Sequence, residues 1–151
     1  MKRCAGFTLV ELIFVMAIIG ILSATALPLY RTIQQRAYGS EASVMLKRIV
    51  DGEIMYFLDN ESFFPEIGNT VNIWHDASDP STADIQRTKD ALKIAIPTGH
   101  FLDFSITNTP ENNCIVTITS STNRALFQGG YRGIMSTIDS DGKVLTSPIL
   151  P

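Results

Sequence analysis

The chain has 151 residues, of which 45% are hydrophobic, and it carries 12 Lys and Arg against 15 Asp and Glu, for a net charge of −3. This length suits a single domain of ordinary size, and the part from residue 37 onward holds 8 basic and 14 acidic residues. Because binding to nucleic acid phosphates requires a basic surface, we do not expect this acidic part to bind nucleic acid.

An apolar segment covers residues 7–30, with the sequence FTLVELIFVMAIIGILSATALPLY. From Leu12 to Tyr30 it runs 19 residues without a charge, about the length that an α-helix needs to cross a hydrocarbon layer roughly 30 Å thick. The pattern predicts a helix that spans a lipid membrane. Glu11 stands at the head of this segment, and an acidic residue inside a spanning helix is normally paired. Glu11 therefore needs a partner.

Residues 1–6, MKRCAG, form a short basic leader that ends in Gly6, and Glu11 is the fifth residue counted from Phe7. This block resembles the type IV prepilins, the family that includes type IV pilins and the pseudopilins of type II secretion. The resemblance implies that a prepilin peptidase cuts after Gly6 and, as an N-methyltransferase, methylates Phe7. It also implies a single-pass precursor in the bacterial inner membrane, which an assembly ATPase and a membrane platform protein polymerise with other copies of the same chain.

Glu11 also has a physical reading that does not depend on the family. Cleavage after Gly6 would create an ammonium group on Phe7, one helical turn from Glu11. A buried carboxylate is tolerable beside an opposite charge, because a low dielectric strengthens the pairing. The short spacing strains such a pair within one helix, whereas the geometry between neighbouring helices is free. We therefore predict that Glu11 and Phe7 of adjacent copies pair during assembly.

Two other interpretations of this segment remain open. A secretory signal peptide would explain the basic start and the A-x-A pattern at residues 24–26. Its apolar core, however, is usually about 7 to 15 residues long, and a glutamate within it is out of place. A plain membrane anchor explains the length of the segment, but it explains neither the Gly6-Phe7 pair nor Glu11.

The spanning helix has two expected weak points, Gly20 and Pro28. A proline removes one backbone hydrogen bond and crowds the carbonyl group four residues earlier. We therefore expect a kink near residues 24–28. The family resemblance further implies that the stretch between Gly20 and Pro28 melts in an assembled filament.

Residues 31–58 should continue the helix with an amphipathic pattern. Apolar side chains recur at steps of three and four residues, which predicts a stripe covered by the rest of the chain. The stripe consists of Ala42, Met45, Leu46, Ile49, Val50, Tyr56 and Phe57. Charged residues should lie mostly on the other side of the helix, namely Glu41, Lys47, Arg48, Asp51 and Glu53.

Residues 59–98 are rich in Asn, Asp, Ser, Thr and Pro and show no sustained period. This composition predicts a long loop from helix to sheet, with a short helix that starts near Asp79-Pro80-Ser81 and runs toward Lys93. We expect Trp74 to anchor the loop to the core.

Residues 99–151 alternate between strand-like runs and turn clusters. The runs cover residues 100–107, 114–121, 131–138 and 143–146, and Ser140-Asp141-Gly142 is a hairpin signal. The sequence predicts an α+β fold in which a long amino-terminal helix, membrane-spanning in its first half and amphipathic in its second, packs on an antiparallel sheet of three or four strands. This pattern also resembles the globular head of the pilin fold.

The cysteines exclude an internal disulfide in a processed chain, because Cys4 leaves with the leader and only Cys114 remains. Cys114 opens an apolar run, so we expect it to be a small buried hydrophobe rather than a reactive thiol.

Metal candidates are weak. Asp139 and Asp141 flank a loop that resembles the calcium loop of the major pseudopilin, but two carboxylates fall short of the 6 to 8 oxygen ligands that Ca²⁺ takes. A solvated hairpin turn is favoured there. His75 with Asp76 and Asp79 is a single histidine in a polar loop, which is little basis for a metal site.

The function that this sequence favours is structural. It contains no P-loop, nucleophile elbow or paired catalytic constellation, so we expect neither enzyme activity nor a cofactor. The resemblance implies a type IV pilus subunit with its head in the periplasm or on the cell surface. One alternative is a type II secretion pseudopilin, which the missing disulfide and the Asp-Ser-Asp-Gly loop slightly favour. The other is a monomeric membrane-anchored periplasmic binding domain.

Overall fold

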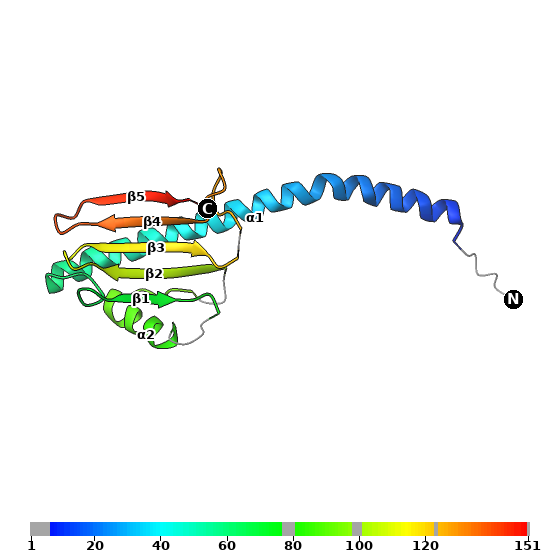
Figure 1. Ribbon diagram of the computed structural model, residues 1–151. Helices are drawn as coiled ribbons and strands as arrows, with labels where there is room; N and C mark the ends of the chain where they lie inside the picture. The colour runs from blue at the N-terminus through cyan, green and yellow to red at the C-terminus, as the bar shows by residue number, and fades with distance from the viewer. Residues whose placement is uncertain (1–6, 77–80, 98–100, 123, 151) are drawn as a thin grey trace. The chain divides into compact units, whose positions relative to one another are not determined.

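The computed structural model describes residues 7–76, 81–97, 101–122 and 124–150. The described residues form two helices and five strands, which Figure 1 labels. The elements, in chain order, are α1 (Leu9–Asn60), β1 (Thr70–Ile73), α2 (Ser81–Leu92), β2 (Leu102–Asn108), β3 (Cys114–Ser120), β4 (Gly133–Ile138) and β5 (Val144–Ile149). The chain divides into two compact units, residues 1–34 and residues 35–151, which we call the amino-terminal unit and the head.

The head contains one antiparallel sheet with the strand order β1-β2-β3-β4-β5, so that every strand pairs with its neighbours in the chain. The predicted α+β class is therefore confirmed, but the sheet has five strands where we predicted three or four. The additional strand is β1, which lies in the segment predicted as loop. Its four residues pair with β2, and Val71 and Ile73 are each only 1% exposed.

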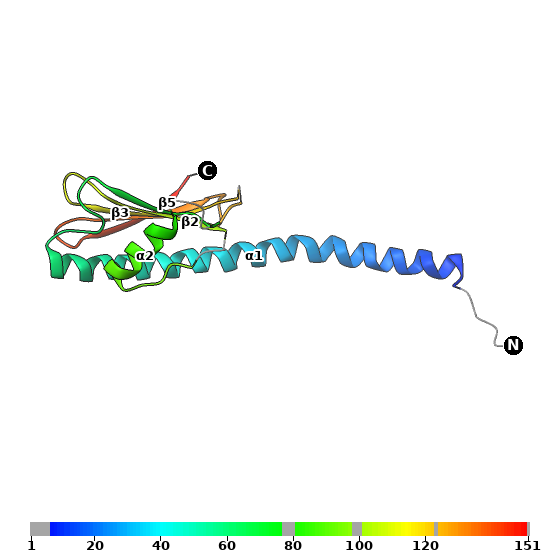
Figure 2. The ribbon, with the colours of Figure 1, turned by 90° about the horizontal axis from the view of Figure 1, so that it is seen from below.

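The core of the head lies between one face of the sheet and the second half of α1, as Figure 2 shows from below. The buried helix residues are spaced three and four apart, in agreement with the predicted amphipathic stripe. Their sheet partners alternate along the central strands. The main members of this core are Ala42, Met45, Leu46, Ile49, Leu102, Phe104, Ile106, Cys114, Val116, Ile118 and Ile138.

Two predictions for side chains in the head are wrong. Trp74 does not anchor the loop to the core, because it is 40% exposed, and Val71 and Ile73 of β1 are buried instead. Glu53 does not lie on the polar side of α1, because its side chain is fully buried. The predicted short helix is confirmed as α2, Ser81–Leu92.

The predicted hairpin at residues 139–143 is confirmed. Gly142 has a φ of +79°, a conformation that glycine adopts without strain. The backbone N–H of Asp139 donates to the carbonyl oxygen of Lys143 at 3.1 Å, which closes the turn between β4 and β5. β5 continues to Ile149 and is thus longer than the predicted run of residues 143–146.

The segment from residue 124 to residue 132 packs against α1 within the head. The Gln35 side chain donates from Nε2 to the carbonyl oxygen of Phe127 at 2.6 Å, and Leu126 is 2% exposed. At Gly39 the helix and this segment are so close that a Cβ atom would overlap the carbonyl oxygen of Leu126. The segment is thus attached to the helix without a disulfide.

Candidate assembly site

The amino-terminal unit presents an apolar surface, because every residue from 7 to 33 is exposed. α1 is the one helix of the described chain whose length and composition would allow it to cross a membrane. Isolated apolar side chains on a surface are ordinary, but a contiguous apolar surface marks contact with lipid or with another protein. Its large apolar members include Phe7, Leu9, Val10, Leu12, Ile13, Phe14, Met16, Ile18, Ile19, Ile21 and Leu22.

Glu11 lies in the first turn of α1, and its partner in the structure is Thr8. The Thr8 backbone N–H and hydroxyl group donate to Oε2 of Glu11 at 3.4 and 3.2 Å. In return, the backbone N–H of Glu11 donates to the Thr8 hydroxyl oxygen at 3.3 Å. This reciprocal arrangement is a capping box, which satisfies backbone donors that a helix start leaves without partners.

The sequence contained the signal for this cap, since Thr8-Leu9-Val10-Glu11 matches the S/T-x-x-E pattern of a capping box. We interpreted Glu11 as a charge that needs a counter-ion and did not predict the cap. The bonds are long for O–H···O and N–H···O geometry, so the carboxylate is held weakly and remains exposed. It is therefore able to accept a stronger partner.

Phe7 is 81% exposed, and it directly precedes Thr8. Its nitrogen is part of a peptide bond while residues 1–6 are attached, so an ion pair between Phe7 and Glu11 requires a cleaved chain. Gly6 lies outside the described residues. Phe7 thus lies two residues before the start of α1 and Glu11 lies in its first turn, and the pairing between copies stays a prediction.

Gly20 and Pro28 both lie inside α1, which is assigned as helix without a break from Leu9 to Asn60. The carbonyl oxygen of Pro28 accepts the Thr32 hydroxyl group at 3.1 Å. A Cβ atom at Gly20 would meet nothing within 4 Å. The predicted melting concerns a filament, so it remains a prediction for the assembled state.

The head contains a buried polar cluster that we did not predict from the sequence. Glu53 of α1 accepts the backbone N–H of Phe64 at Oε2, at a distance of 3.0 Å, while its Oε1 is buried and has no hydrogen-bond partner within the described chain. Burial raises the pKa of Glu53 to about 8, and the bonds from Phe64 and from the Cys114 thiol offset only part of that rise. Burial and the neighbouring Glu53 also raise the pKa of Cys114, which keeps the thiol neutral. The prediction of a buried, unreactive Cys114 is confirmed for its burial, at 0% exposure.

Spacing was the signal that could have found Glu53. It follows Ile49 by four residues and Leu46 by seven, so it continues the buried stripe of α1. Its charge made us place it on the polar face. Asn108 is buried in the same region and donates from Nδ2 to the carbonyl oxygens of Phe63 and Pro65 at 2.8 and 2.9 Å.

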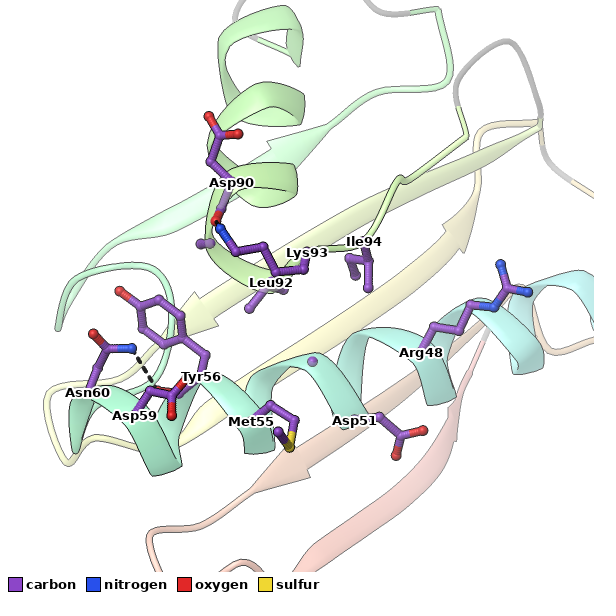
Figure 3. A pocket seen from close by; sticks show the side chains of 12 residues that line it. Arg48, Asp51, Met55, Tyr56, Asp59, Asn60, Asp90, Leu92, Lys93 and Ile94 are labelled. Carbon is purple, nitrogen blue, oxygen red and sulfur yellow. Dashed lines mark hydrogen bonds between the residues drawn. The ribbon is translucent and has the colours of Figure 1, made fainter.

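A surface groove of about 690 Å³ runs between the end of α1 and the end of α2, as Figure 3 shows. Asp51, Asp59 and Asp90 supply negative charge at its rim, and Arg48 and Lys93 supply positive charge. Its remaining lining residues are Gly52, Met55, Tyr56, Asn60, Ala91, Leu92 and Ile94. None of these lining residues is a histidine, cysteine or serine.

The metal candidates have other contacts. Oδ1 of Asp139 accepts the backbone N–H groups of Asp141 and Lys143 at 3.1 and 2.8 Å, as in an ordinary polar turn. His75 contacts Asp103 of β2, with 2.9 Å between Nδ1 and Oδ1. Asp79 lies outside the described residues. Within the described chain, no group of three or more His, Cys, Asp or Glu side chains could hold a metal ion.

Comparison with known proteins points to one class of protein. Residues 1–27 match the family model described as the prokaryotic N-terminal methylation motif. The chain is 35% identical to the type IV major pilin protein PilE1 of Neisseria gonorrhoeae, over 68% of this chain and 61% of that protein. It is 40% identical to the type IV major pilin protein PilA of Myxococcus xanthus, over 44% of this chain and 34% of that protein.

A third relative is the type IV wide pilus major component PilA4 of Thermus thermophilus, with 38% identity over 42% of this chain and 48% of that protein. The matches thus span between 34% and 61% of the length of these three relatives. No solved structure gives a significant match to the chain.

Proposed function

Since the chain belongs to the type IV prepilin-like family, we propose that it is a structural subunit of a type IV pilus-like filament. The observation that carries this proposal is the coincidence, within residues 1–27, of the methylation motif with an exposed apolar helix whose first turn is capped by Thr8 and Glu11. The surface of such a helix must be covered, first by lipid and then by the same helices of other copies. The proposed filament therefore has the amino-terminal units in its centre and the heads outside.

The processing steps are part of the same proposal. A prepilin peptidase cuts after Gly6 and methylates Phe7, which leaves an ammonium group one turn from Glu11. The weak bonds from Thr8 to Glu11 support this idea, because they leave the carboxylate exposed and free to meet the ammonium group of a neighbouring copy. An assembly ATPase and a platform protein in the inner membrane are the other proposed partners.

Filament formation needs a force other than the removal of apolar surface from water, because lipid already provides an apolar environment for the helix. Dispersion contacts between helices supply one part. The pair of charges between Phe7 and Glu11 of adjacent copies supplies the other, since a low dielectric strengthens it. Catalysis has no place in this proposal.

One observation favours a secretion pseudopilin as the second candidate. The mature chain would hold a single, fully buried cysteine and so no internal disulfide. The relatives named above favour the pilus, since all three are components of pili by name. Shearing of intact cells separates the two candidates, because only a surface pilus is released as long filaments. A pseudopilin and a monomeric membrane-anchored binding domain would both release no long filaments.

The mature amino terminus tests the proposal most directly. Mass spectrometry of the processed chain should find N-methylated Phe7 as its first residue, and Gly6→Ala should leave the precursor uncut in the membrane. A mature chain that begins after Ala26 would show instead that residues 1–26 are a secretory signal peptide, and it would remove the basis for a filament.

A further inference from the structure

Glu53 has no role in the proposed filament, yet it is the only acidic side chain of the described residues that solvent does not reach at all. Its two carboxylate oxygens differ. Oε2 accepts the backbone N–H of Phe64 at 3.0 Å, whereas Oε1 is buried without a hydrogen-bond partner in the described chain. A buried polar atom without a partner is costly in free energy, so this position calls for an explanation.

The Glu53 carboxyl group bonds to Phe64 within residues 61–65, the segment that leads out of α1 toward the sheet. We call this segment the exit turn. The exit turn is held to the core by buried polar contacts: Phe64 bonds to Glu53, and Asn108 of β2 donates to the carbonyl oxygens of Phe63 and Pro65. The Phe63 ring also stacks on Phe57 of α1, with 4.5 Å between the ring centroids. The exit turn belongs to neither a helix nor a strand, so it can open without loss of the hydrogen bonds of the sheet, although its own bonds and the burial of Phe63 and Phe64 must be given up.

The groups that face Glu53 offer it no compensating positive charge. Cys114 faces it from β3 as a neutral thiol, and Asn108 on β2 is uncharged. Glu61 and Glu66, on and just beyond the exit turn, are exposed, and Glu66 pairs with Arg87 of α2 at 3.0 Å. None of the salt bridges among the described residues includes Glu53.

We propose that Glu53 is a proton-linked latch of the exit turn: the neutral carboxylic acid keeps the turn closed on the core, and loss of its proton opens the turn and admits water. In the closed turn, an ionised Glu53 would keep one oxygen without a hydrogen-bond partner. It would have lost its hydration, and no positive charge would compensate for that loss. Opening the adjacent irregular segment restores that hydration while the sheet stays intact.

The direction of the pH effect follows from the pKa of Glu53, which burial raises from 4.5 to about 8. The closed form keeps its proton between these two values, while an open, hydrated Glu53 would lose it. Opening therefore becomes up to about tenfold easier for each pH unit within this window and levels off above pH 8. Between pH 6.5 and pH 9 the opening constant should rise roughly thirtyfold.

Amide hydrogen exchange on the full-length mature chain in detergent micelles tests the latch. The exchange rate of a peptide that covers the exit turn is measured at pH 6.5 and 9 and corrected for the pH dependence of exchange in an unfolded peptide. Protection in the wild type should fall roughly thirtyfold. The matched variant is Glu53→Gln, which keeps an acceptor for the N–H of Phe64 but cannot ionise, and its protection should stay nearly constant.

A second peptide, over β3, separates local opening from general unfolding. In the wild type its protection should stay higher than that of the exit turn at both pH values, although the same loss of a proton also makes global unfolding easier as the pH rises. Equal protection of β3 and of the exit turn at both pH values would overturn the latch in favour of a general loss of stability. Unchanged protection of the exit turn in the wild type would overturn it as well.

The wild type alone also decides the question, in case Glu53→Gln does not fold. Infrared spectroscopy at pH 7 should show the carbonyl band of one protonated carboxylic acid, which disappears as the exit turn opens at higher pH. A spectrum at pH 7 without this band would overturn the proposal. These experiments need no filament, so their outcome is independent of the proposed function.

Discussion

Replacing Gly39 by alanine should destabilise the head, although alanine is the better helix former. The change from glycine to alanine inside a helix contributes about 1 kcal/mol of stability. At Gly39, however, the new methyl group would overlap the carbonyl oxygen of Leu126 and lie 3.3 Å from Cε1 of Phe127. A backbone carbonyl group cannot rotate away as a flexible side chain would, so the segment from residue 124 to residue 132 must shift.

The balance of these effects sets the magnitude. Overpacking a tight contact costs about 1 to 3 kcal/mol, and a shifted segment also loses the 2.6 Å hydrogen bond from Gln35 to Phe127, worth about 1 kcal/mol. Set against the gain in helix propensity, Gly39→Ala should lower the free energy of unfolding by about 1 to 3 kcal/mol. For a unit of this size, that corresponds to a melting temperature lower by about 4 to 12 °C.

Circular dichroism of the full chain in detergent micelles measures this shift, with Gly52→Ala as the control. A methyl group at Gly52 would lie 3.3 Å from both Cβ and the carbonyl oxygen of Leu92, so a small adjustment and the better helix propensity should nearly cancel. The control should melt within about 2 °C of the wild type. If Gly39→Ala instead raised the melting temperature, helix propensity would outweigh the contact, and the packing of residues 124–132 on α1 would be refuted.

Two further changes test the buried cluster. Asn108→Ala removes both hydrogen bonds to the carbonyl oxygens of Phe63 and Pro65, and two buried acceptors without partners should cost about 2 to 4 kcal/mol in urea unfolding; a loss below 0.5 kcal/mol, on the order of an ordinary surface substitution, would contradict this. Glu53→Gln should remove a pH dependence: because burial raises the pKa of Glu53 to about 8, the wild type loses stability as pH rises from about 4.5 to about 8, by at most about 5 kcal/mol. If the free energies of unfolding of the wild type and of Glu53→Gln changed with pH in the same way, Glu53 could not be the source of this pH dependence.

The fold followed from sequence wherever a pattern was long enough to have a period. The three- and four-residue spacing from Ala42 to Val50 specified the buried face of α1, and alternation specified three of the strands almost to the residue. β1 escaped because four residues, Thr70–Ile73, are too few for a period. Its strand character comes from pairing with β2, a contact between segments about 35 residues apart.

The errors at single residues have a common cause. We assigned Glu53 to the polar face from its charge and Trp74 to the core from its size, and the structure reverses both. A residue's position relative to the periodic stripe was the better guide: Glu53 continues the stripe of Leu46 and Ile49. Burial there is possible because the carboxyl group can stay neutral, a property that residue type alone does not reveal.

Of the predicted assembly residues, the sequence identified Glu11 but not its local partner. The capping box with Thr8 offers a second reason for an acid at this position, since an acid in the first turn also interacts favourably with the helix dipole. The cap and the ion pair can form one after the other. The long bonds to Thr8 can hold the carboxylate in a precursor, and a full positive charge can replace them after cleavage. They make different demands on the side chain, however.

Two variants separate these demands. Thr8→Val removes the capping hydroxyl group, which should weaken the helix start by about 1 kcal/mol, but it leaves the charge of Glu11, so filaments should still form. Glu11→Gln keeps a side chain that a capping box accepts but removes the negative charge, so filament yield in sheared fractions should fall to background while processing stays normal. If Glu11→Gln assembled as the wild type does and Thr8→Val did not, the carboxyl group would act as a helix cap. Attraction between the acid of one copy and the new amino terminus of the next could then not drive assembly.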